Sequence, residues 1–236
     1  EMPTSISLID KDDNYNYYKE DFLIVIDSDN KRIQKFSLSG QLLASVDSRM
    51  IGLSSAYFAY SAIDYNGNVY ITDMINNQIH KFDRFLNYII SIGRQGTGQV
   101  EFISPRGLFI NKRFGQIFII DEGGGQYYWL ATDGFIIGCF PSRLTDQQPQ
   151  TTIALYLTDV SELRIEIYNE QQQLVRSLVP STYQKPGEVL IAWDGRDNNG
   201  QFVSVGEYTI KVILNPTYSA QRRTFSKELK TTIKKI

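Results

Sequence analysis

The chain has 236 residues and a formal net charge of −2, with 42% hydrophobic and 21% charged residues. These values are ordinary for globular domains, and the small net charge excludes the broad basic field that nucleic-acid binding needs. The sequence has no run of about 18 apolar residues, so we expect no membrane-spanning helix. Its start, EMPTSISLID, lacks an initiator methionine and a signal-peptide layout, so we expect it to begin at a processing site or within a longer protein.

Three similar units follow one another from the N-terminus. Each unit carries an aspartate at the same point, and these aspartates, Asp27, Asp73 and Asp121, are spaced by 46 and 48 residues. Such a period is typical of a four-stranded propeller blade. We expect the propeller blades within residues 1–140, at about 5–46, 57–92 and 107–140.

The second unit shows its strands most clearly. Alternating β-prone residues predict strands over 57–63, 69–72, 78–82 and 88–92. Asn66-Gly67 indicates a tight hairpin, and Asn76-Asn77 indicates a second turn because asparagine tolerates positive φ. No segment of the chain shows a helical period over ten residues, so the prediction is an all-β protein.

This second unit resembles the NHL repeat of six-bladed β-propellers, and the resemblance covers about residues 5–140. The third unit departs from the pattern, because Gly123-Gly124-Gly125 replaces the asparagine turn and Tyr128-Trp129 breaks the alternation. The matching residues are Gly67, Val69, Tyr70, Asp73, Asn77, Ile79, Phe82, Gly93, Gly96, Gly98, Phe102, Pro105 and Gly107.

The repeated aspartates are interpreted as structural markers, since a carboxylate at a strand end can accept backbone N–H groups of the next turn. Metal binding by the three aspartates is the alternative, which the absence of a second carboxylate at ligand spacing disfavours.

Three blades are half of a six-bladed ring. The missing blades must precede Glu1, come from another copy or be replaced by a partner, and we favour the first source.

Residues 141–150, with Pro141 and Pro149, read as a polar linker. Beyond it, residues 151–236 alternate in short strands, at 163–168, 174–178, 189–193 and 206–212, which predicts a small β-sandwich. The fold prediction is therefore a partial, three-blade propeller followed by an immunoglobulin-like β-sandwich.

This C-terminal segment is similar to the FlgD-type immunoglobulin-like domain of flagellar hook-capping proteins. The resemblance implies a structural motif in which the tryptophan fills the core and charged residues fix a loop. It also implies an exported bacterial protein, in the periplasm, on the cell surface or secreted. The motif residues are Trp193, Asp194, Gly195, Arg196, Asp197, Gly200, Gly206 and Tyr208.

The sequence shows no reaction centre, so we predict a protein that is not an enzyme and binds no cofactor or metal. His80 is the only histidine, and we read its position on an alternating strand as packing. Because there is only one histidine, we expect no His-dependent triad and no multi-His metal site. Calcium at the acidic segment 10–14 stays an open alternative, although the glycine and distal glutamate of an EF-hand loop are missing. Cys139 reads as a small buried hydrophobe.

The favoured function is a non-catalytic protein-binding or scaffolding component of an exported assembly, with protein partners or further copies of itself. One alternative is part of a larger propeller enzyme, lyase-like or esterase-like, with its site on missing blades. The other is a polysaccharide-binding surface protein. Tyr15, Tyr17 and Tyr18 are the candidates for interaction in that case, since tyrosine rings stack on sugars.

Overall fold

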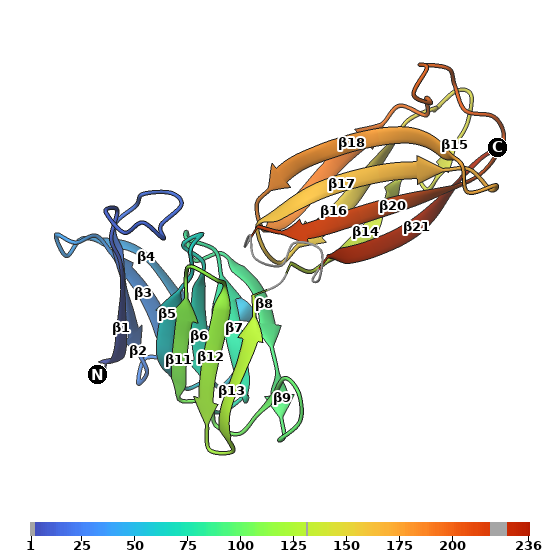
Figure 1. Ribbon diagram of the computed structural model, residues 1–236. Coiled ribbons are helices and arrows are strands. Elements are labelled where there is room, and N and C mark those ends of the chain that lie inside the picture. The colour runs from blue at the N-terminus through green and yellow to red at the C-terminus, as the bar shows by residue number, and fades with distance from the viewer. Residues whose placement is uncertain (1–2, 131, 218–225) are drawn as a thin grey trace. The chain divides into compact units, whose positions relative to one another are not determined.

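The computed structural model describes residues 3–130, 132–217 and 226–236. The chain divides into two compact units, residues 1–130 and residues 131–236. Both are built from β-strands, and the described ranges contain one short 3₁₀ helix, η1 (Ser48–Ile51) (Figure 1). No helix in these ranges is long and apolar enough to cross a membrane.

The first unit consists of three antiparallel sheets in chain order, which are the three blades (Figure 1). Blade 1 contains β1 (Pro3–Ile9), β2 (Phe22–Asp27), β3 (Arg32–Phe36) and β4 (Leu42–Asp47). Blade 2 contains β5 (Phe58–Ile63), β6 (Val69–Asp73), β7 (Gln78–Phe82) and β8 (Tyr88–Ile92). Blade 3 contains β11 (Gly107–Asn111), β12 (Gln116–Asp121) and β13 (Gly124–Trp129). A short parallel pair, β9 (Arg94–Gln95) and β10 (Glu101–Phe102), lies between blades 2 and 3 in the sequence.

The repeated aspartates Asp27, Asp73 and Asp121 are the last residues of β2, β6 and β12. Counting back from each aspartate therefore identifies equivalent positions in the three blades. Side chains alternate between the two faces of a strand, so the residues one and three places before the aspartate share one face. We call this the forward face, because in blades 1 and 2 it packs on the next blade. The opposite face, which packs on the previous blade, is the rear face.

Two apolar cores hold the blades together through these faces. One core packs the forward face of blade 1, including Ile24 and Ile26, on the rear face of blade 2, including Val69 and Ile71. The second core packs the forward face of blade 2 on the rear face of blade 3, including Ile117 and Ile119. Each internal contact thus joins one forward face to one rear face.

The third blade differs from its prediction. Residues 134–140, expected as its last strand, form β14 (Gly134–Phe140), which pairs antiparallel with β16 (Thr151–Leu157) in the second unit. The alternating pattern alone does not show whether this strand belongs to a blade or to the sandwich, because a strand with one apolar face fits either sheet. The β12–β13 turn is also two residues shorter than its counterparts. Spacing from the repeated aspartate predicts Tyr128 as the equivalent of His80, but the strand register makes Gln126 the equivalent.

The second unit is a sandwich of two sheets. The smaller sheet has the order β14–β16–β19, with β19 at Gly187–Trp193. The larger sheet has the order β15–β21–β20–β17–β18. Its strands are β15 (Arg143–Leu144), β17 (Ser161–Tyr168), β18 (Leu174–Gln184), β20 (Gly206–Pro216) and β21 (Lys227–Lys235).

Residues 141–150 are not a free linker, because they include β15, which pairs with β21 inside the larger sheet. Leu144 of this strand is fully buried in the sandwich core. The polar composition of the segment concealed this role, because one buried side chain is enough to anchor a two-residue strand. The sandwich therefore starts before residue 141 and not at residue 151.

Trp193 lies at the centre of the sandwich core. Its ring packs edge-on against Tyr208 at 5.8 Å, and its indole N–H donates to the Arg196 carbonyl at 3.0 Å. The side chain is fully buried among strands of both sheets. Cys139 is also buried in this core, and burial raises the pKa of its thiol.

We expect Trp193→Ala to lower the free energy of unfolding of the second unit by about 3–5 kcal/mol, because it removes the largest core side chain and leaves a cavity. Urea unfolding followed by circular dichroism measures the loss, while Trp129 fluorescence reports on the first unit. Leu190→Ala, on the same strand but exposed, is the control and should change stability by less than about 0.5 kcal/mol. Equal effects of the two variants would contradict the central role of Trp193.

Candidate functional site

The first strands of the three blades lie side by side, since β5 contacts both β1 and β11. Their starting ends surround an open groove of about 670 Å³, which we call the inner groove. The groove draws its lining from β1, the start of β5, the turn after β6 and the segment before β11. These lining residues are Pro3, Thr4, Tyr57, Ala59, Tyr60, Met74, Ile75, Ser104 and Arg106.

The inner groove is mainly apolar, with a single charged side chain in its lining. Tyr60 and Ile75 are both exposed to solvent there. Arg106 forms an ion pair of 2.5 Å with Glu122, and both side chains are about half exposed. Exposed ion pairs are weak, so this arginine can exchange Glu122 for a carboxylate of a bound molecule at little cost. The lining thus suits a segment that carries an apolar or aromatic group beside an acid.

Asp73 fixes two sides of the groove. Its Oδ1 accepts the backbone N–H groups of Tyr57 at 3.1 Å and Ile75 at 3.0 Å. Its Oδ2 accepts the Asn76 side-chain amide at 2.6 Å. Asp121 makes a related connection in blade 3, accepting the Ile103 N–H at 2.8 Å. These aspartates therefore join the segment that leads into the first strand of the blade to the turn that follows the second strand.

A buried chain of hydrogen bonds runs from Asp73 across blade 2. His80 Nε2 lies 3.1 Å from Asp73 Oδ2, and its Nδ1 lies 2.7 Å from Ser91 Oγ. Ser91 Oγ is also 2.7 Å from the Tyr88 hydroxyl. The sequence interpretation excluded a triad by counting histidines, but one histidine is sufficient to join an aspartate to a serine. The feature that reveals this chain of hydrogen bonds is the register of β7 and β8, which places His80 directly opposite Ser91.

This Asp73–His80–Ser91 chain connects strands and leaves no reacting group open to solvent on the histidine. The His80 ring is fully buried, and each ring nitrogen is engaged by a neighbour. Burial opposes the charge on Asp73, but hydrogen bonds from His80, Asn76 and the backbone hold the pKa of its carboxyl below the usual value. The chain thus links β6, β7 and β8 of blade 2.

The acidic loop between β1 and β2 holds the three candidate tyrosines. Tyr15 and Tyr17 are exposed, whereas Tyr18 is partly buried with the Arg84 guanidinium 3.7 Å from its ring centre. Tyr17 packs edge-on against Tyr18 at 4.9 Å and against Tyr65 at 5.8 Å. The structure therefore brings Tyr17 and Tyr18 together, with Tyr65 as a third ring, and their crossed rings do not form one flat stacking surface.

Carboxylates of the same loop bind neighbouring groups. Asp13 accepts the Tyr15 N–H at 2.8 Å and pairs with Lys112 of the third blade at 3.0 Å. Both contacts lower the pKa of the Asp13 carboxyl. In the described part of the chain, no three His, Cys, Asp or Glu side chains are arranged to hold a metal ion.

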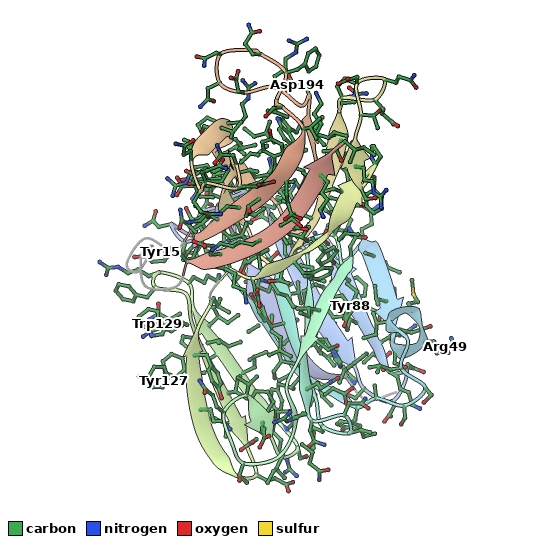
Figure 2. All side chains as sticks on the ribbon, turned by 90° about the vertical axis from the view of Figure 1, so that its right-hand side faces the viewer. Tyr15, Arg49, Tyr88, Tyr127, Trp129 and Asp194 are labelled. Atoms are coloured by element: carbon green, nitrogen blue, oxygen red, sulfur yellow. The ribbon has the colours of Figure 1, made fainter. Side chains whose placement is uncertain are left out.

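The charged residues after Trp193 build the loops at one end of the sandwich (Figure 2). Asp194 accepts the Arg196 N–H at 3.1 Å. Asp197 accepts the N–H groups of Asn199 and Gln201, both at 2.9 Å. Arg196 donates to the Gly200 carbonyl at 2.6 Å, and its guanidinium stacks on Phe202 at 3.7 Å. The side chains of this motif therefore bind its own backbone.

Gly195 is required at its place in this motif. Its φ is +70°, and a Cβ added there would lie 2.1 Å from the Pro149 carbonyl oxygen. Tyr208 completes the motif, since its ring packs on Trp193 and its hydroxyl donates to the Ser204 carbonyl at 2.8 Å. Gly206 starts β20 two residues earlier.

Family models match both parts of the chain. A model described as a 6-bladed beta-propeller matches residues 59–131, and one described as the FlgD Ig-like domain matches residues 142–215. These matches confirm the predicted propeller and FlgD-type immunoglobulin-like domain. The assignment of the blades to the NHL type in particular stays a prediction. A search of curated proteins found no match.

Bacterial proteins of known structure resemble the chain at low sequence identity. PorZ, described as an essential surface component of the type-IX secretion system of Porphyromonas gingivalis, shares 11% identity and a TM-score of 0.43, over 100% of this chain and 30% of that chain. FlgD from P. aeruginosa shares 18% identity and a TM-score of 0.31, over 43% of this chain and 71% of that one. Virginiamycin B lyase from Staphylococcus aureus shares 11% identity and a TM-score of 0.34, over 96% of this chain and 83% of that chain. The chain thus spans less than a third of the length of PorZ.

We expect the stability of the first unit to fall on acidification partly through Asp73. Because the folded-state pKa of this carboxyl is below its unfolded value of about 3.9, its contribution is complete above that pH and is lost as the pH falls through the lowered pKa. Asp73→Asn should lower stability at pH 6 and flatten the loss between about pH 5 and pH 2. Urea midpoints measured across this range test it, with Asp12→Asn, in the exposed loop, as the charge control. If the urea midpoint of Asp73→Asn fell with pH as steeply as that of the parent chain, Asp73 would not be a source of the acid sensitivity.

Proposed function

We propose that the chain is a non-catalytic protein-binding or scaffolding component of an exported bacterial assembly. The observation that carries the proposal is the inner groove, an open and largely apolar surface with one cationic side chain at Arg106. Such a lining binds a segment of another molecule through apolar contact and orients it by charge. The neighbouring Asp73–His80–Ser91 chain supports binding over catalysis, because the His80 ring is fully buried within blade 2.

The partner segment that fits the inner groove is an extended stretch of protein. An aromatic or aliphatic side chain would contact Tyr60 and Ile75, and an adjacent aspartate or glutamate would pair with Arg106. Tyrosine and arginine are the residue types that contribute most to binding at protein interfaces, since both combine apolar area with directed polar groups. The chain's net charge of −2 gives nucleic acid no comparable attraction.

The sandwich offers a second surface for such an assembly. The outer face of the β14–β16–β19 sheet carries exposed Phe135, Ile137 and Leu190, and the Phe135 ring stacks on Tyr156 at 5.4 Å. Exposed apolar groups that gather on one sheet face mark interaction sites more often than scattered ones do. A location outside the cytoplasm is part of the proposal. The resemblance to FlgD-type domains supports it.

We expect random peptides selected on the immobilised chain to be enriched in an aromatic or aliphatic residue next to an acid. Tyr60→Ala and Arg106→Glu should each weaken binding of a selected peptide by roughly tenfold or more, as titration calorimetry measures. Leu38→Ala, exposed on the β3–β4 turn and outside the groove lining, is the matched control. Peptides without this pattern, or binding that both groove variants leave unchanged, would contradict the proposal.

A further inference from the structure

Blade 3 has one strand fewer than its neighbours. Blades 1 and 2 are four-stranded sheets, whereas the described residues give blade 3 the three strands β11, β12 and β13, so β13 is its edge strand (Figure 1). Edge strands present a row of backbone N–H and C=O groups to which a further strand can be added. The two complete blades show the pattern of such a strand, since β4 and β8 hold this place in them.

Residues 134–140 carry the pattern of this fourth strand. Ser45 of β4, Ser91 of β8 and Cys139 of β14 each lie 18 residues after the repeated aspartate of their unit, and an apolar residue follows each of them. The β12–β13 turn is two residues shorter than in blade 2, which leaves two more residues for the connection after β13 and keeps the spacing. The third repeat therefore continues in step into β14, although β14 pairs with β16.

A glycine precedes this strand at the point where the complete blades turn. Gly40 and Leu86 each lie 13 residues after the repeated aspartate and have φ values of +85° and +66°. Gly134 holds the same place in the third unit. In the sandwich it meets a different need, because a Cβ there would lie 2.6 Å from the Tyr156 carbonyl oxygen. One glycine therefore fits both a blade turn and the close approach to β16.

The strand β14 has apolar side chains on both faces. Cys139 is 8% exposed and packs in the sandwich core, whereas Ile137 and Phe140 are 46% and 59% exposed. Blade 1 shows the reverse arrangement, since Ser45, the equivalent of Cys139, is exposed and Val46, the equivalent of Phe140, is buried. A strand that is apolar on both sides suits two registers, one with each face toward a core.

The two family matches leave this strand unassigned. The propeller model ends at residue 131 and the FlgD Ig-like model begins at residue 142, so β14 lies between them. In the sandwich β14 is an edge strand, held in its sheet by β16 alone. Its departure would therefore leave the β16–β19 pair intact.

We propose that residues 134–140 exchange between two sheets. They pair with β16 in the sandwich or with the edge of β13 in blade 3. The exchange completes blade 3 with a fourth strand and makes β16 the edge strand of the smaller sheet. An exposed strand edge accepts an extended segment of another protein. The segment is thus a switch that covers or uncovers a docking edge on the sandwich, and it acts independently of the inner groove.

The register of the complete blades fixes the second arrangement. Ser91 lies opposite His80, and their side chains meet at 2.7 Å. Gln126 is the equivalent of His80 and Cys139 is the equivalent of Ser91, so these two lie opposite each other when the strand pairs with β13. In the sandwich Cys139 lies opposite Ile153 instead. The two arrangements therefore give Cys139 different neighbours.

Disulfide trapping with Gln126→Cys tests the exchange directly, because Cys139 is the only cysteine of the chain. We expect mild oxidation of the dilute chain to join position 126 to Cys139 within one molecule, as peptide mapping detects. Tyr127→Cys is the matched control, since Tyr127 is 60% exposed and lies on the opposite face of β13. Its yield should be lower by about tenfold or more, because a disulfide needs both side chains on one face. Circular dichroism verifies that both variants are folded.

Thiol labelling follows the same exchange without a new cysteine. Cys139 is buried, so a thiol reagent reaches it only when β14 leaves its place in the sandwich. Phe140→Glu puts a charge at a position that is exposed in the sandwich and buried in the blade arrangement, and should slow labelling by about tenfold or more. Phe135→Glu is the control that should not slow it, because Phe135 is exposed and its blade equivalents Gln41 and Asn87 are exposed too.

Two kinds of result would overturn the exchange. Folded Gln126→Cys that forms no disulfide would leave the β13 edge to a strand of another polypeptide, and equal yields from Gln126→Cys and Tyr127→Cys would show contact without a defined register. Labelling of Phe140→Glu as fast as that of the parent chain would show that Cys139 opens by another route. All these measurements are made without a peptide ligand, so the proposed function of the inner groove stands or falls separately.

Discussion

A β-sheet with apolar residues on both faces is stable only when both faces are covered, and this constraint organises the first unit. The central strand β6 is buried along its whole length, because blade 1 covers one face of blade 2 and blade 3 covers the other. Blade 2 is thus complete, whereas blades 1 and 3 each have one satisfied face and one open face. Burial of apolar area is the main favourable term in folding, so the uncovered faces are also where the chain has most to gain from association.

Carboxylates complement this packing at the ends of the strands. The apolar faces set which blade lies next to which, but they do not fix the backbone at the strand ends, where N–H groups would lack partners. Asp73 and Asp121 accept those N–H groups and join the entry of each inner strand to the exit of the next strand. The same bonds fix the Tyr57 and Ile75 backbones, so the geometry of the inner groove follows from the repeat itself.

The sequence predicted the elements well where local pattern decides them. In blade 2, the predicted strands 78–82 and 88–92 agree with β7 and β8, because turn residues mark both ends. Residues 134–140 were assigned to the wrong sheet, since a strand's partner is a long-range property that alternation does not encode. The Asp73–His80–Ser91 chain escaped notice for a related reason. It requires the register of three strands, and that register becomes evident only when their pairing is known.

Which faces stay uncovered was only partly predictable. The repeat count indicated half of a ring, but the aromatic character of Phe118 and Tyr127 could not be assigned to an open or a closed face from the sequence. Their equivalents in blade 2, Tyr70 and Lys81, are both buried. Residue type alone therefore does not separate a face that packs internally from one left open to solvent. The inner groove was not anticipated either, because its lining comes from four segments distant in the chain.

The ion pair between Asp13 and Lys112 has a consequence for the order of events during synthesis. It joins residues 99 positions apart in the sequence, and it anchors a loop of blade 1 on blade 3. A chain that emerges from the ribosome cannot finish this loop until the last blade has been made, even though β1 and β2 are already present. Contacts of such long sequence separation slow folding, because the intervening chain must be ordered before they form. The Asp13 side of this loop can therefore take up its final contacts only after blade 3 has been made.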